Sequence, residues 1–241
     1  FLQNAGLSTH LFVVDNASPH PHSRQVAEKY AEQFPAYFTV IANAENKGYA
    51  GGQNTGLLAA YNAGYDYFFA INNDIEFSNV SWYKQATNTL ARSSKVLVGA
   101  RLIRDNLWVF YDGQHTPYIE GWCIGFDRKF LETVGFFDEQ FFPAWVEDVE
   151  LCWRAVCQGY ELQRVEVGIR HLFGVTSYDG RIESYLTDEE KAKPAVTPFN
   201  VAERKHIQDA RRLTERNVRK FFAKIEAHND QWIGPQEFTK Q

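Results

Sequence analysis

Three short apolar runs in the first third of the chain, each followed by a helical pattern, constrain its fold more than any other feature. The runs have the length of strands and lie at residues 11–14, 38–42 and 66–71. Helical patterns follow them at residues 23–34, 53–62 and 80–91, the first with apolar residues at i, i+3 and i+4 spacing. Repeated strand-to-helix units predict an α/β fold with a mostly parallel central sheet flanked by helices.

The second half of the chain continues this alternation and then changes character. Residues 96–103 and 161–169 are predicted strands, and residues 127–134 and 146–158 are predicted helices, each closed by a glycine. Residues 179–199 are polar and contain two prolines, which indicates a linker. The sequence therefore predicts a main domain over residues 1–178, a linker, and a C-terminal helical extension over residues 200–241.

The helix predicted in this extension begins at Asn200, which can cap it together with Glu203, and reaches about residue 228. An apolar stripe along it favours packing on its own domain or on a second copy of the chain, which would give a homo-oligomer. The alternative is peripheral docking on a membrane surface. That alternative rests on a basic face made of Arg211, Arg212, Arg216, Arg219 and Lys220.

Composition narrows the class of protein. With 241 residues, 44% of them hydrophobic, the chain can bury a substantial core. Its 25 basic and 30 acidic side chains include no basic run, which argues against nucleic acid as a partner. No apolar run approaches the roughly 20 residues of a membrane-spanning helix. Cys123, Cys152 and Cys157 show no CxxC spacing and are interpreted as reduced thiols of a cytoplasmic protein.

Polar side chains follow two of the predicted strands where each strand ends. Asp15 follows the first, and Asn72, Asn73 and Asp74 follow the strand at residues 66–71. In α/β sheets, ligands bind outside the carboxyl ends of the strands. The carboxylate of Asp74 would suit a hard divalent cation that also binds a phosphate oxygen. The alternative is that the triplet only shapes a turn.

Two further carboxylates, Glu147 and Asp148, lie in AWVEDVELCWRA at the start of a predicted helix. Acidic residues are favoured there by the free amides and the helix dipole, so a capping role is one interpretation. The aromatic-rich segment GFFDEQFFPAW precedes them and could form a wall for a sugar ring, so a general base is the other. His171, after a predicted strand, is a candidate metal ligand or simply a hydrogen-bonded histidine.

The segment NKGYAGGQNTG, residues 46–56, is rich in glycine. Glycines let the backbone approach a ligand closely, and amides at a helix start can hold an anion. The spacing matches neither GxGxxG nor GxxxxGK[ST], so it supports neither a Rossmann dinucleotide site nor a P-loop.

Taken in order, these segments resemble the family 2 glycosyltransferases, an inverting group with the GT-A fold. VVDNAS resembles the nucleotide-holding loop, NKGYAGGQNTG the family's NxGfaggxNxG segment, and INNDI stands where the metal-binding DxD motif falls. GWCIGFDRKFLETVGFFDEQFF and EDVELCWRAVCQGY resemble the acceptor-side segment and its ED motif, and RHLFG resembles the late histidine motif. The resemblance covers about residues 1–178.

The resemblance implies transfer of a sugar from a nucleotide-diphosphate sugar, UDP- or dTDP-linked, to a hydroxyl of a saccharide or glycolipid. Asp148 would be the base, Glu147 would orient the acceptor or support the base, and Asp74 with His171 would bind Mn²⁺ or Mg²⁺. The implied donor site consists of Asp15, Asn16, Asn46, Lys47, Gly48, Gly51, Asn54, Asn72 and Asn73. The implied acceptor side carries Trp122, Phe142 and Trp145. Such an enzyme would be cytoplasmic and could work at the inner membrane surface.

The sequence departs from the family pattern in two places. Asn72 replaces the first aspartate of DxD, which resembles the NND form of rhamnosyltransferase-like members. The family's first strand would precede Phe1, so we expect roughly 15–25 further residues upstream. Three alternatives stay open: a nucleotidyltransferase, a non-catalytic sugar- or nucleotide-binding domain, and a glycosyltransferase domain within a longer polypeptide.

Overall fold

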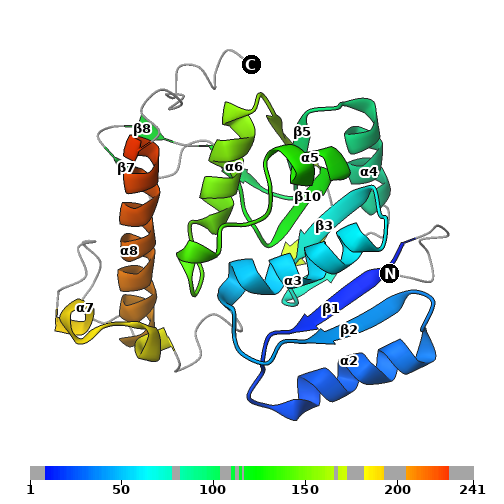
Figure 1. Cartoon of the computed structure of the whole chain (residues 1–241), viewed down its shortest axis with the longest axis horizontal. Coiled ribbons are helices and arrows are strands. Elements are labelled where there is room, and N and C mark those ends of the chain that lie inside the picture. The colour runs from blue at the N-terminus through cyan, green and yellow to red at the C-terminus, as the bar shows by residue number, and fades with distance from the viewer. Residues whose placement is uncertain are drawn as a thin grey trace.

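The computed structural model describes residues 9–77, 82–103, 110–111, 114–115, 117–165, 168–172, 182–192 and 205–227 (Figure 1). Its first unit is a parallel pair of strands, β1 (Leu11–Asp15) and β2 (Phe38–Ala42), with helix α2 (Pro21–Gln33) packed on both. Helix α3 (Gly48–Asn62) contacts β1 and also β3 (Tyr67–Ile71), so it bridges this pair to the central sheet. The predicted strand-to-helix units are therefore present.

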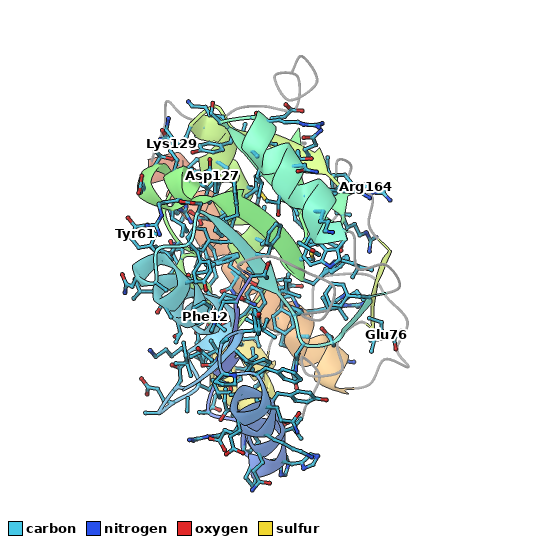
Figure 2. The ribbon with its side chains drawn as sticks, turned by 90° about the vertical axis from the view of Figure 1, so that its right-hand side faces the viewer. Phe12, Tyr61, Glu76, Asp127, Lys129 and Arg164 are labelled. Carbon is cyan, nitrogen blue, oxygen red and sulfur yellow. The ribbon has the colours of Figure 1, made fainter. Side chains whose placement is uncertain are left out.

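The central sheet has four strands in the order β11 (Glu161–Arg164), β5 (Val96–Gly99), β10 (Cys123–Asp127), β3. β5 and β11 are parallel, and β10 is antiparallel to both β3 and β5. Three of the four strands thus share one direction, as predicted, and β10 is the exception. Figure 2 shows Asp127, which pairs with Tyr67 at the start of β3, on the opposite side of the view from Glu76, which follows the end of β3.

The remaining strands form three antiparallel pairs. β4 (Ile75–Phe77) pairs with β12 (Ile169–His171), β6 (Leu102–Ile103) with β9 (Tyr118–Ile119), and β7 (Phe110–Tyr111) with β8 (Gln114–His115). The predicted strands at residues 96–103 and 161–169 are each divided between the central sheet and one of these pairs. The first of these strands leaves the central sheet after Gly99, where a Cβ would overlap the side chain of Ile119.

Helices complete the layers on the central sheet. They are α4 (Trp82–Arg92), α5 (Arg128–Thr133) and α6 (Glu147–Cys157), with the 3₁₀ turn η1 (Glu139–Phe141) between the last two. α5 is capped by the Asp127 carboxylate, which accepts a hydrogen bond from the Phe130 amide at 2.8 Å. Side chains from β3, β5, β10, α3, α5 and α6 form the main core, including the fully buried Leu97, Ile124 and Leu151. The buried side chains of α4 form a second cluster with β5.

The C-terminal helix α8 (Lys205–Ala227) lies alongside α6 in Figure 1. Phe221 and Phe222 of α8 pack with Phe141 and Trp153 in one buried cluster, so the helix packs on its own domain. The part of the expected linker that the structure describes is helical, with η2 (Ile182–Tyr185) and α7 (Asp188–Ala192) both contacting α8. Among the described residues, no helix is long and apolar enough to cross a membrane.

The glycine-rich segment is also different from the prediction. We expected a loop before a helix at residue 53, but α3 begins at Gly48. A Cβ at Gly51 would lie 2.6 Å from the Lys47 Cβ, and one at Gly48 would lie 2.7 Å from the Pro143 carbonyl oxygen. The glycines therefore let the first turn of α3 pack closely against neighbouring backbone, and this packing overrides their low helix propensity.

Candidate active site

The pairing of β4 with β12 brings Asp74 and His171 together from positions far apart in the sequence. His171 stands opposite Ile75 in the ladder, and the Asp74 carbonyl accepts a hydrogen bond from the Leu172 amide. The His171 Nε2 atom lies 3.1 Å from Asp74 Oδ1, and Asp74 is only 7% exposed. A buried carboxylate beside an imidazole can supply two ligands to a divalent cation.

The surroundings of this pair fit a cation that keeps some of its ligands from the substrate. Asn72 Oδ1 is buried and accepts no hydrogen bond from any described residue. Within the part of the chain that the structure describes, no group of three or more His, Cys, Asp or Glu side chains could hold a metal. A cation beside Asp74 and His171 would therefore complete its coordination with water or diphosphate oxygens, as Mg²⁺ usually does. Asn73 is exposed next to this position.

Glu147 and Asp148 are the first two residues of α6. Asp148 is hydrogen-bonded to a segment from a different part of the chain. Its Oδ2 atom accepts a hydrogen bond from the Gly121 amide at 2.9 Å, and its Oδ1 atom accepts one from the Val149 amide at 2.9 Å. The residue after Gly121, Trp122, stacks its ring on His171 with 5.0 Å between ring centroids. The Gly121–Trp122 dipeptide thus links the two candidate carboxylate centres directly.

The protonation of these two carboxylates is set by burial. Burial raises the pKa of Asp148 to about 6, against the opposing effect of the Gly121 and Val149 amides, and Glu120 adds to the rise. The pKa of Glu147 lies well above its ordinary value because of burial and, next, the charge of Asp148. Glu147 Oε2 is buried and has no hydrogen-bond partner among the described residues. A carboxylate with a pKa just below neutral is suited to general-base work.

The predicted nucleotide-binding residues after β1 belong to a network of asparagines. Asn16 donates to Asn46 Oδ1 at 3.0 Å and to the Gly48 carbonyl at 2.8 Å, and it accepts a hydrogen bond from the Lys47 amide. Asn43 donates to Asn16 Oδ1 at 2.9 Å. Sequence reasoning missed Asn43, although its place directly after β2 is the signal already used at the other strand ends.

The other predicted donor residues have different surroundings. The Asp15 carboxylate accepts a hydrogen bond from the Ser18 amide at 3.1 Å and so shapes the loop after β1. Asn54 exchanges hydrogen bonds with the backbone of Phe137, and a Cβ on Gly51 would contact Glu139. Asn54 and the Cα of Gly51 therefore face the segment around the start of η1. The Gly51 carbonyl accepts a hydrogen bond from the Thr55 hydroxyl, which also pairs with Asn43 of the Asn16 network.

The three predicted acceptor-side aromatics do not form one wall. Trp122 covers His171, Phe142 packs edge-on against Tyr185 with centroids 5.1 Å apart, and Trp145 packs into clusters formed with α8. A hollow of about 340 Å³ lies beside the first of them. It is lined by Ala100, Arg101, Leu102, Trp122, Arg164 and Ile169. Arg164 is at the edge of the molecule in Figure 2.

Comparisons with known proteins concern the family and the fold of this chain. Residues 2–149 match the model of glycosyl transferase family 2. The fold is similar to that of the mannosyltransferase PcManGT from Pyrobaculum calidifontis, solved with GDP-Man and Mn²⁺, at a TM-score of 0.53 and 17% identity over 90% of this chain. It is also similar to that of GalNAc-T7, solved with UDP, GalNAc and Mn²⁺, at a TM-score of 0.56 and 13% identity over 91% of this chain.

The chain spans 66% of the first of these proteins and 51% of the second. No curated protein matches the sequence. The two structural matches confirm the GT-A-like α/β fold expected from the sequence.

Proposed function

Because the chain belongs to glycosyl transferase family 2, we propose that it transfers a sugar from a nucleotide-diphosphate sugar to a hydroxyl group of a saccharide or glycolipid acceptor, with inversion at the anomeric carbon. One observation carries this proposal. The Asp148 carboxylate binds the Gly121 amide, and His171 of the Asp74–His171 pair stacks on Trp122, so the base and the cation-binding pair of this proposal contact adjacent residues. An acceptor and a donor diphosphate can then be held side by side.

Asp148 is the general base of this proposal. It takes the proton of the acceptor hydroxyl while that oxygen bonds to the anomeric carbon, and the bond from this carbon to the diphosphate breaks. The nucleoside diphosphate leaves with the bonding electrons, and one displacement inverts the configuration. With a pKa of about 6, Asp148 is ionised at pH 7 and still basic enough to accept the proton. Glu147, buried beside it, orients the acceptor.

Asp74 and His171 would hold Mn²⁺ or Mg²⁺. Asn72, two residues before Asp74, has a buried side-chain oxygen without a hydrogen-bond partner among the described residues, and this oxygen could serve as a further ligand. The cation would stabilise the negative charge that develops on the leaving diphosphate. Both structurally similar proteins were solved with Mn²⁺, which supports this choice of metal. The asparagine network of Asn16 and Asn46, with exposed Lys47 beside it, would bind the nucleotide part of the donor.

The NND triplet favours a rhamnosyltransferase-like member, whose donor would be a dTDP- or UDP-sugar. The test is a panel of UDP-, dTDP- and GDP-sugars with saccharide and lipid-linked acceptors, assayed for sugar transfer with Mn²⁺, with Mg²⁺ and with EDTA. We expect metal-dependent release of nucleoside diphosphate with one donor class, and loss of this release in Asp74→Ala. Metal-independent turnover in both proteins would contradict the assignment of Asp74, and no transfer with any donor would contradict the function.

A further inference from the structure

Side chains of α8 bind the backbone of the loop that leads into α6. The Asn217 side-chain nitrogen lies 2.9 Å from the Phe141 carbonyl oxygen, 2.9 Å from that of Ala144 and 3.2 Å from that of Trp145. Asn217 is fully buried. Arg216 donates to the Phe142 carbonyl at 2.9 Å. Four carbonyls of one short loop thus depend on two neighbouring residues of the C-terminal helix.

This loop has an unusual backbone just before the candidate base. Trp145 and Val146 have φ angles of +74° and +79°, in the left-handed region that a β-branched residue rarely adopts. Glu147 is the first residue of α6, and the Glu150 amide already donates to the Val146 carbonyl. The conformation of these two residues therefore sets the direction of the α6 axis at its start. It also sets where the carboxylates of the first turn point. Such a conformation persists only where the surroundings enforce it.

The other side of the loop rests on the first turn of α3. The Tyr49 amide donates to the Pro143 carbonyl at 2.7 Å, and the Tyr49 hydroxyl donates to the Gly121 carbonyl at 2.6 Å. Gly121 is the residue whose amide binds Asp148. The loop is thus held between α3 and α8, and the same contacts reach the segment that orients the base.

Packing of α8 on the domain does not explain why residue 217 is an asparagine. Its Oδ1 atom is buried and accepts no hydrogen bond from the described residues, and leaving such an atom unpaired is unfavourable. Leu213 and Phe221, one turn before and after Asn217 on α8, lie in buried apolar clusters. A buried amide is needed here because three carbonyls of an irregular loop require a donor.

An ion pair also connects α8 directly to α6. The Lys224 ammonium of α8 lies 2.6 Å from Glu150 Oε1 and 2.6 Å from Asp138 Oδ2. Glu150 is fully buried and lies two residues after Asp148. Both the approach to α6 and its first turns are therefore attached to α8.

We propose that Asn217, assisted by Arg216, is a positioning residue for sugar transfer, which holds Trp145 and Val146 in their left-handed conformations and so directs the Asp148 carboxylate at the acceptor. The C-terminal helix is then a working part of the active site and not an appended extension. This inference rests on the proposed function, since it concerns the same base. Its consequence is that loss of the Asn217 amide lowers turnover and leaves donor binding unchanged.

The test compares Asn217→Leu, which keeps a similar volume without the donor, with Ile225→Ala as the matched control. Ile225 is buried on the same helix, in the cluster that contains Phe221 and Phe222, and its aliphatic side chain forms no hydrogen bond. With the donor that the panel identifies, we expect kcat to fall by about 10- to 100-fold in Asn217→Leu, the cost typical of a small misplacement of a reacting group. The donor KM and the affinity for its nucleoside diphosphate with Mn²⁺ should stay within about twofold.

The control separates positioning from stability. We expect Ile225→Ala to lower Tm at least as much as Asn217→Leu does and to keep kcat within about twofold. Equal losses of kcat in the two variants, or normal turnover in Asn217→Leu, would overturn the inference. If Asn217→Leu does not fold, Arg216→Met replaces it in the test. We expect kcat of Arg216→Met to fall by about 3- to 10-fold, and Arg216→Lys to lose less of the turnover.

Failure of this inference and failure of the proposed function give different results. Wild-type protein without sugar transfer contradicts the function itself. Active wild-type protein whose turnover does not respond to Asn217 or Arg216 contradicts only the positioning role.

Discussion

The unit formed by β1, α2 and β2 and the unit formed by α6 and α8 differ in how they use their side chains. None of the 13 residues of α2 is buried, and Tyr30 on that helix is 50% exposed. Eight of the 11 residues of α6 are buried, including the acidic Glu147 and Glu150. Figure 1 shows α2 at the outer edge of the molecule and α6 between α8 and the central sheet.

The difference indicates which property each unit controls. In the first unit the half-buried polar side chains after the strands bind one another, as Asn16 and Asn43 do, so their loss should affect donor affinity. In the second unit the carboxylates are buried among packed helices, so their loss should affect turnover and stability. Each prediction below would weaken or refine this division.

The largest effect is expected at the base. Asp148→Asn keeps the shape of the side chain but removes the proton acceptor, so we expect kcat to fall by about 10²- to 10⁴-fold with unchanged donor affinity. Glu147→Gln is the matched variant, with an expected loss below about tenfold because it only orients the acceptor. Steady-state kinetics of both variants measure this. A larger loss in Glu147→Gln would move the base by one residue.

A core substitution tests the division through stability. Leu151→Ala in α6 removes a fully buried side chain, and we expect it to lower the free energy of unfolding by about 2–5 kcal/mol. Val26→Ala on α2, where Val26 is 41% exposed, should change it by less than about 0.5 kcal/mol. Urea denaturation measures both. Similar losses would show that the first unit is packed as tightly as the second.

The fold was more predictable than the site, for a physical reason. The apolar runs that became β2 and β3 were recognisable because strands and helices have local periodicities. The pairing of Asp74 with His171 was expected only from the family resemblance, because it depends on the contact between β4 and β12. The hydrogen bonds from Asn217 to three carbonyls had no sequence signal, since a polar residue on a helix gives no indication of the distant loop it binds.

A substitution in the first unit should act on donor affinity alone. Asn43→Ala removes the amide that binds Asn16 Oδ1, and we expect the donor KM to rise by about 3- to 10-fold, the cost of one hydrogen bond. Because the side-chain hydrogen bonds of Asn43 go to Asn16 and Thr55 and not to α6, kcat should stay within about twofold. Asn62→Ala, at the last residue of α3, is the control for removing an asparagine. A fall in kcat without a change in KM would contradict the division.

The buried Glu147 should make stability depend on pH. Its folded-state pKa lies well above the unfolded value of about 4.3, so above that pH the folded state binds more protons than the unfolded state. Stability therefore falls as pH rises from about 4, and Asp148 adds to this fall up to about pH 6. We expect Glu147→Gln to remove part of this pH dependence. The difference in Tm between the variant and the wild-type protein should therefore shift in favour of the variant as pH rises. Glu161→Gln, at an exposed position in β11, is the control for the loss of one charge.

The smallest effect concerns the pH profile of the base. If Asp148 takes the proton, kcat/KM should fall as the pH is lowered through about 6, where Asp148 becomes protonated. The charge of Glu120 raises this pKa, so Glu120→Gln should move the acid limb to lower pH, while the amide oxygen of the new side chain can still accept the hydrogen bond from Trp122 Nε1. A profile measured across the acid and neutral range for both proteins tests this. If the acid limb does not move, the loss of activity at low pH reports the protonation of a group other than Asp148. The burial of Asp148 would then contribute to the packing of α6 and not to proton transfer.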